Sequence, residues 1–179
     1  MRIDEAQQDF RLAYFDGAPG VLASALAWLA AGLTSVYGSP QRAVVALFVG
    51  GMLIHPVSIV LTKALGRSAK HSAGNPLGRL AMETTVWLIL CLPLAYVVSQ
   101  FRIAWFFPAM LLVIAGRYTV FASVFGLRIF WVCAAALAAA AYGLVKLGAD
   151  PTAGAFTGAA IETLFASILF SRSRWRRAA

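Results

Sequence analysis

Apolar residues fill six long segments of the chain, roughly residues 21–37, 43–65, 77–99, 103–122, 129–145 and 152–170. Each segment holds about 17 to 23 residues, and at 1.5 Å per residue a helix of that length crosses the hydrocarbon core of a bilayer. Polar stretches that carry glycine or proline separate the segments, as at Gly38-Ser39-Pro40. The pattern therefore predicts six membrane-spanning segments.

The spans are expected to be helices. Lipid offers no hydrogen-bond partner to a free backbone group, so a span must be a helix or belong to a closed barrel. The strict alternation of polar and apolar residues that a barrel strand shows is absent here. Because most connections are short, neighbouring helices should be antiparallel. We expect an all-α integral membrane bundle of about six transmembrane helices.

Residues 1–16 show a different pattern. Their apolar residues recur at helical spacing and their acidic residues lie on the other faces, which predicts a short amphipathic helix. Its acidic character argues against docking on anionic lipid, so we expect it to pack on the protein's own cytoplasmic face. The chain then divides into this helix, a transmembrane domain over 17–171 and a basic cytoplasmic tail over 172–179. The acidic start does not match a cleavable signal peptide.

Composition agrees with a membrane protein, and charge sets its orientation. Hydrophobic residues make up 61% of the chain and charged residues 12%, whereas a soluble domain has roughly 25% charged residues. The net charge of +8 comes from basic residues concentrated beside the spans, which favours contact with membrane lipids and not with nucleic acid. Near the span ends, one side receives only Arg42, Arg102 and Lys146. Both termini should therefore face the cytoplasm.

Several chemistries are not indicated. Cys91 and Cys133 lie in separate apolar spans without a second cysteine at ligand spacing, so we expect neither a disulfide nor a metal site. The sequence lacks a nucleophile elbow, a phosphate-binding loop, a dinucleotide fingerprint and an HExxH helix. No cofactor is predicted.

Short motifs along the chain resemble a family of small bacterial multi-pass membrane proteins of unknown function. The motifs are Asp9-Phe10, Gly17 and Pro19 ahead of Trp28, Asn75-Pro76-Leu77-Gly78 at the start of the third span, and Phe107-Pro108 early in the fourth. The resemblance covers most of the chain. It implies a protein of the bacterial inner membrane, and it implies no activity and no functional residue.

Four ionisable residues stand out inside the spans, where a charged side chain costs on the order of 3 kcal/mol and is usually paired or functional. Two of them, Glu83 and Arg117, lie at matching depth, roughly 8 Å inside the inner boundary of consecutive spans. We therefore predict a buried ion pair between them. The alternative is that Glu83 pairs with Arg79 on its own helix and Arg117 extends to the headgroups.

The other two, His55 and Glu162, lie nearer the midplane, each roughly 14 to 15 Å from the inner boundary. His55 shares a helix face with Ser58 and Thr62 and precedes Pro56, which predicts a kink. Transporters place substrate and ion sites at interrupted helices. A substrate or ion pathway along His55, Glu162, Ser58 and Thr62 is one hypothesis, and a satisfied core role for His55 is the other.

Glu162 follows Gly154 and Gly158 at spacings of eight and four residues, and small residues at that spacing mark close helix contact. The carboxyl group should therefore point into the bundle or into a subunit interface, which leaves a homodimer open.

The polar stretch between the second and third spans predicts contact with lipid headgroups. It is basic, and Arg67, Lys70 and Arg79 are the candidates for binding lipid phosphate. His71 in the same loop is expected to be solvated.

Three functions remain open. The first is a transporter or channel for a small solute or ion with a midplane His and Glu site, favoured by the near absence of soluble mass. The second is an intramembrane lipid-modifying enzyme that uses Glu83, Arg117 and the basic loop. The third is a structural or assembly subunit without transport activity.

Overall fold

The computed structural model describes the backbone of residues 1–178 and the side chains of residues 1–174. Trp175, Arg176 and Arg177 of the predicted tail have side chains outside that range. The elements are α1 (Ile3–Tyr14), η1 (Phe15–Gly17), α2 (Ala18–Tyr37), α3 (Pro40–Ala64), α4 (Leu77–Phe101), η2 (Ile103–Trp105), α5 (Phe106–Phe125), α6 (Ile129–Lys146) and α7 (Pro151–Ala178). In the described residues, six helical stretches are long and apolar enough to cross a membrane. The predicted all-α membrane architecture is confirmed.

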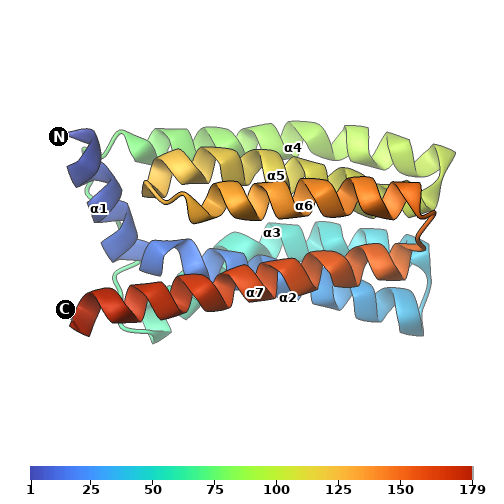
Figure 1. The fold of residues 1–179 in the computed structure, drawn as a ribbon, viewed down its shortest axis with the longest axis horizontal. Coiled ribbons are helices and arrows are strands. Elements are labelled where there is room, and N and C mark those ends of the chain that lie inside the picture. Colours follow the sequence, from blue (N-terminus) through green and yellow to red (C-terminus); the bar gives the residue numbers. More distant parts are fainter. Residues whose placement is uncertain (179) are drawn as a thin grey trace.

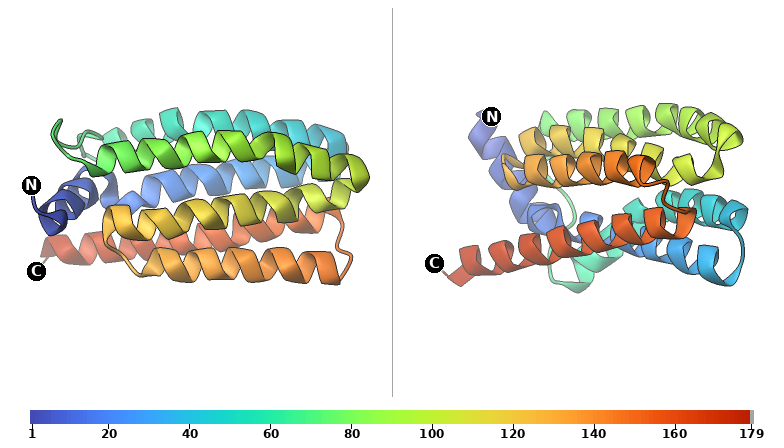
Figure 2. Two further views of the ribbon diagram at one scale, coloured as in Figure 1. Left: turned by 90° about the horizontal axis from the view of Figure 1, so that it is seen from above. Right: turned by 45° about the vertical axis from the view of Figure 1, so that its right-hand side comes forward.

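The six long helices form two layers of three. One layer holds α4, α5 and α6, and the other holds α2, α3 and α7 (Figure 1, Figure 2). Helix α2 packs against α3 and α7, helix α5 packs against α4 and α6, and α7 meets α5 and α6 across the layers. The short α1 lies across one end of the bundle, and both termini are at that end (Figure 1).

The helices end at the polar stretches that carry glycine or proline, as predicted, except at the end of the last helix. Ser39 caps α3 by accepting a hydrogen bond from the backbone N–H of Arg42, and Gly126 ends α5 with φ of 63°. The last helix was expected to end near residue 170, but α7 continues to Ala178. No glycine or proline interrupts the chain there, so the basic tail continues the helix and does not form a separate segment.

The glycines of α7 contact neighbouring helices of the same chain. A Cβ atom added to Gly158 would lie 2.6 Å from the Trp28 ring on α2, and one added to Gly154 would lie 2.8 Å from Cβ of Phe107 on α5. The predicted close contact is therefore confirmed, but inside the bundle. This face is covered by α2 and α5, so it does not provide the subunit interface that we considered. Homodimer formation by another face stays a prediction.

Helix α1 docks on the end of α5, as expected from its acidic, amphipathic pattern. The side-chain amide of Gln7 donates to the carbonyl of Ser123 at 2.8 Å, and Nη1 of Arg11 donates to the carbonyl of Phe125 at 2.6 Å. The last carbonyls of a helix have no partner within the helix. These two side chains therefore satisfy the end of α5 and hold α1 across the bundle.

Asn75 ties α1 to the start of α4. Its Nδ2 donates to the carbonyl of Ala6 at 2.9 Å and to the carboxylate of Asp9 at 2.8 Å, and its Oδ1 accepts from the N–H of Leu77 at 3.0 Å. Asp9 also accepts from the N–H of Ser72 at 2.8 Å. Burial raises the pKa of Asp9, but the hydrogen bonds from Asn75 and Ser72 outweigh burial and hold this pKa below its ordinary value.

His71 is packed against α1 and is not solvated as expected. It is half-buried, its ring stacks on Phe10 with centroids 4.5 Å apart, and its Nδ1 shares a hydrogen bond with the Tyr14 hydroxyl at 3.0 Å. A Cβ atom on Gly78 would collide with this ring. The prediction failed because the sequence alone does not place α1 beside the loop.

Candidate functional site

Glu162 lies at the centre of a polar cluster between the two helix layers. Its side chain has no exposed surface, and it follows the start of α7 by eleven residues, which places it roughly 16 Å along the helix. The Tyr118 hydroxyl on α5 donates to Oε1 of Glu162 at 2.8 Å. Ser24 of α2, also buried, lies beside the same carboxyl group. Oε2 of Glu162 is buried and has no hydrogen-bond partner among the described residues.

Aromatic rings surround Tyr118. Its ring centroid lies 5.9 Å from that of Phe121 and 5.8 Å from that of Phe130. Tyr118 keeps only 3% of its surface exposed. Burial in apolar surroundings strengthens the electrostatic interaction between the hydroxyl and the carboxyl group, because little water is present to compete.

Arg117 precedes Tyr118 and extends the cluster toward α4. Its Nη2 donates to the hydroxyl of Thr85 at 3.2 Å, and its guanidinium lies over the Phe121 ring at 5.0 Å from the centroid. The guanidinium also interacts electrostatically with Tyr118 and Glu162. We call these residues the Glu162 cluster: Glu162, Tyr118, Ser24, Arg117 and Thr85.

The predicted ion pair between Glu83 and Arg117 is wrong. Among the described residues no ion pair joins these two side chains, and Glu83 is exposed. Two residues along an α-helix turn by about 200°, so Glu83 and Thr85 point in nearly opposite directions from α4. Arg117 reaches the Thr85 face. The alternative pairing of Glu83 with Arg79 is not formed either, and both side chains are exposed.

The structure does not bring His55 and Glu162 together. His55 is exposed on α3, whereas Glu162 on α7 faces α5 and α2. Helix α2 packs against both α3 and α7 and so separates the two residues. The hypothesis of a joint His and Glu site fails because the sequence does not fix how far apart α3 and α7 lie.

The polar stripe of α3 is satisfied within its own helix. The Ser58 hydroxyl donates to the carbonyl of His55 at 2.7 Å, and the Thr62 hydroxyl donates to the carbonyl of Ser58 at 2.6 Å. Pro56 has no N–H to donate within α3. Hydrogen bonds from serine and threonine side chains to backbone carbonyls are common beside a proline in a membrane helix. A part for these residues in a pathway stays a prediction.

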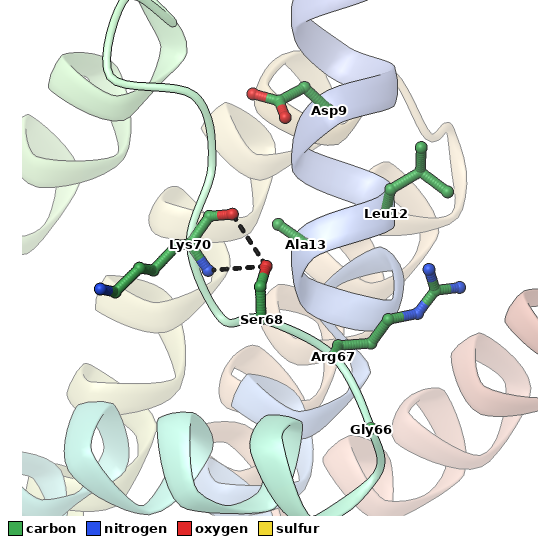
Figure 3. Close-up of a pocket in the computed structure, with 7 residues that line it drawn as sticks. All are labelled: Asp9, Leu12, Ala13, Gly66, Arg67, Ser68 and Lys70. Atoms are coloured by element: carbon green, nitrogen blue, oxygen red, sulfur yellow. Dashed lines mark hydrogen bonds between the residues drawn. The ribbon is translucent and has the colours of Figure 1, made fainter.

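The candidate headgroup residues do not converge. An open pocket of about 340 Å³ lies between α1 and the loop after α3, lined by Asp9, Leu12, Ala13, Gly66, Arg67, Ser68 and Lys70 (Figure 3). The side chains of Arg67 and Lys70 point to opposite sides of this pocket (Figure 3). Arg79 is exposed on α4 and does not line the pocket. Binding of lipid phosphate by these three residues stays a prediction.

Sequence reasoning missed three members of the cluster: Tyr118, Ser24 and Thr85. Each is an uncharged polar residue within an apolar span, and such residues are common in membrane helices. The one available signal was that Tyr118 adjoins Arg117. In the described part of the chain, no three His, Cys, Asp or Glu side chains gather as a metal site requires.

These features define a helical membrane protein with six spans and a buried carboxyl cluster between two layers. The chain belongs to a family of unknown function, DUF7010, whose family model matches residues 3–172. The resemblance to an uncharacterised family is thereby confirmed. Comparison with curated proteins finds no match. Comparison with solved structures also finds no match.

Proposed function

We propose that this protein is a transporter or channel for a small solute or ion, and that the carboxyl group of Glu162 binds and releases a proton during its cycle. The observation that supports the proposal is the geometry of that carboxyl group. It is fully buried within a membrane bundle, one oxygen accepts from Tyr118, and the other oxygen has no partner among the described residues. Ionisable groups in such positions commonly mark proton and ion pathways.

The cluster can accommodate both states of the carboxyl group. When Glu162 is ionised, the Tyr118 hydroxyl donates to it and the charge of Arg117 compensates it. When Glu162 is protonated, its own O–H provides one more donor, and the hydroxyl of Ser24, which donates to the ionised carboxylate, can turn to accept from it. If the cluster had partners for only the ionised or only the protonated form, the buried carboxyl group would be held in that one protonation state.

The position between layers adds a second line of support. Contacts within each three-helix layer are more extensive than contacts between the layers. Movement of one layer against the other would therefore disturb few contacts while changing the surroundings of Glu162. Rigid-body movement of this kind is the usual means by which transporters alternate access to a central site.

Transport is tested with purified protein in liposomes that contain a pH-sensitive dye. Gradients of small inorganic ions and of small organic acids and amines are imposed one at a time. We expect at least one gradient to drive a change of internal pH through the wild-type protein. Glu162→Gln keeps the shape of the side chain but cannot exchange a proton, so it should abolish that change.

Glu83→Gln is the matched control, because it removes an exposed carboxyl group from another helix of the same bundle. It should behave as the wild type does. The proposal is refuted if no imposed gradient moves solute or protons, or if Glu162→Gln supports the same pH change as the wild type.

We also propose that the membrane is the bacterial inner membrane and that the termini face the cytoplasm. The end of the bundle that carries the termini also carries the basic loop between α3 and α4, which supports this orientation. In a variant without Cys91 and Cys133, a cysteine at exposed Ser68 should react with a membrane-impermeant thiol reagent only after cell lysis. A cysteine at exposed Leu147, at the other end, should react in intact cells. The opposite pattern would reverse the orientation.

A further inference from the structure

Arg117 carries a positive charge on a half-buried side chain that forms no ion pair with a carboxylate in the described part of the chain. It lies eight residues before the end of α5, roughly 12 Å inside the helix end. No ion pair is formed by its guanidinium within the described part of the chain. Its Nε is buried and has no hydrogen-bond partner there. An arginine side chain does not lose its proton in proteins, so the charge is permanent.

The nearest compensating group does not neutralise this charge directly. Glu162 interacts with Arg117 electrostatically, but Oε1 of Glu162 is engaged by Tyr118, and no hydrogen bond joins the two residues. When Glu162 is protonated, the cluster holds the guanidinium with no anion at all. A buried charge without a partner is strongly unfavourable. An anion beside Arg117 would compensate this charge in that state.

The guanidinium is held by two neighbours and keeps a donor without an acceptor in the described part of the chain. Phe121 lies under its plane at 5.0 Å from the ring centroid, and Thr85 accepts from Nη2 at 3.2 Å. The Thr85 hydroxyl in turn donates to the carbonyl of Ala81 at 3.4 Å, which fixes its orientation. Nη2 has a second hydrogen, and the adjacent Nε carries an N–H without an acceptor among the described residues. Two parallel donors of this kind match the two oxygens of a planar anion.

We propose that Arg117 is the anion-binding residue of the Glu162 cluster, and that the substrate is a small monoanion with two coplanar oxygens, of which a monocarboxylate is the simplest. The inference rests on the proposed function, because it names the substrate of the same site. Entry of the anion together with a proton on Glu162 leaves the net charge of the occupied cluster the same as that of the empty, deprotonated cluster. Such an arrangement avoids carrying an uncompensated charge through the bilayer.

Binding is tested on the full-length protein in detergent by thermal unfolding with sodium formate, acetate or nitrate, and with sodium sulfate at equal ionic strength as reference. An anion that binds the folded state raises the unfolding temperature. We expect acetate or formate to raise it in the wild type. Arg117→Gln should remove the increase, and Arg117→Lys, which keeps the charge but loses the paired donors, should weaken the apparent affinity about tenfold or more.

Three further variants separate the explanations. Arg102→Gln removes an exposed cation at the other end of α4 and should leave the anion effect intact. Glu162→Gln should retain or strengthen the effect, since the anion then has no competing carboxylate. If the effect disappears in Glu162→Gln, Arg117 serves only as the counter-ion of Glu162 and the inference is overturned. Thr85→Val should weaken anion binding. It provides a second test of the site if Arg117→Gln does not fold.

The outcomes also separate the inference from the function on which it rests. If none of the three anions stabilises the wild type beyond sulfate, or if Arg117→Gln and Arg117→Lys keep the full effect, the anion site is refuted even when proton-linked flux is measured. If the anions bind through Arg117 but no gradient drives flux, transport is refuted while the binding site stands.

Discussion

Removing the hydroxyl of Tyr118 should destabilise the protein measurably, because it takes away the hydrogen bond that this hydroxyl donates to Glu162. Tyr118→Phe deletes one oxygen and keeps the ring that packs against Phe121 and Phe130. The lost bond is 2.8 Å long and joins two buried side chains. After the change, Oε1 of Glu162 loses this donor, while the Ser24 hydroxyl stays beside the carboxyl group.

The magnitude follows from the burial of both partners. Leaving a buried polar group without its partner costs roughly 1 to 3 kcal/mol. Water cannot replace the hydroxyl cheaply, since Glu162 has no exposed surface. We therefore expect Tyr118→Phe to lower the free energy of unfolding by about 2 kcal/mol. Tyr142→Phe is the matched control, because Tyr142 is 67% exposed, and its change should lie within about 0.5 kcal/mol of zero.

A double-mutant cycle isolates the bond. Glu162→Leu removes the acceptor, so Tyr118→Phe in that background should cost about 1 to 3 kcal/mol less than in the wild type. The free energies are measured by reversible unfolding of the purified protein in mixed micelles with increasing denaturing detergent. If the two changes are additive within about 0.5 kcal/mol, the hydrogen bond does not stabilise the folded state and the reasoning about the cluster is refuted.

Three further predictions concern packing and the docking of α1. Gly158→Ala should destabilise the protein by about 1 to 3 kcal/mol, because the new methyl group would meet the Trp28 ring at 2.6 Å. Gly143→Ala is the control: its methyl group meets nothing within 4 Å, so the change should be neutral or slightly stabilising. Equal effects of the two changes in detergent unfolding would contradict the close packing of α2 and α7. Because the pKa of Asp9 is held below its ordinary 3.8, the stabilisation of α1 from this carboxylate is complete above about pH 4 to 5 and is lost as the pH falls through the lowered value. Asn75→Ala removes two donors from α1, so hydrogen exchange of the α1 amides should become about tenfold faster at neutral pH, and unchanged exchange would show that α1 does not depend on this contact.

Features that depend on length and local pattern could be predicted from the sequence. The six helices were predictable from the length of the apolar spans and from the short stretches with glycine or proline between them. The docking of α1 was predictable from the amphipathic pattern at the start of the chain. The spacing of Gly154 and Gly158 indicates that Glu162 faces protein and not lipid, either in the bundle or at a subunit interface, because small residues at that spacing allow close helix contact. The carboxyl group is indeed fully buried. Here local spacing was sufficient.

Features that depend on helix rotation could not be predicted. Helices α3 and α4 carry apolar residues on every side, so the sequence does not indicate which face turns inward. The sequence pattern therefore predicts interior positions for Glu83 and His55, whereas both side chains are exposed in the structure. Tyr118 was missed for a related reason, since its role comes from a partner 44 positions away on α7. No local pattern reports such a pairing.

The central claim is that the carboxyl group of Glu162 exchanges a proton inside the membrane. Infrared difference spectroscopy of the protein reconstituted in lipid, recorded across a pH titration, tests this most directly. The C=O stretch of a protonated carboxyl group in apolar surroundings should grow as the pH falls, should shift in Tyr118→Phe and should be missing in Glu162→Gln. A titrating band that persists unchanged in Glu162→Gln would contradict the claim.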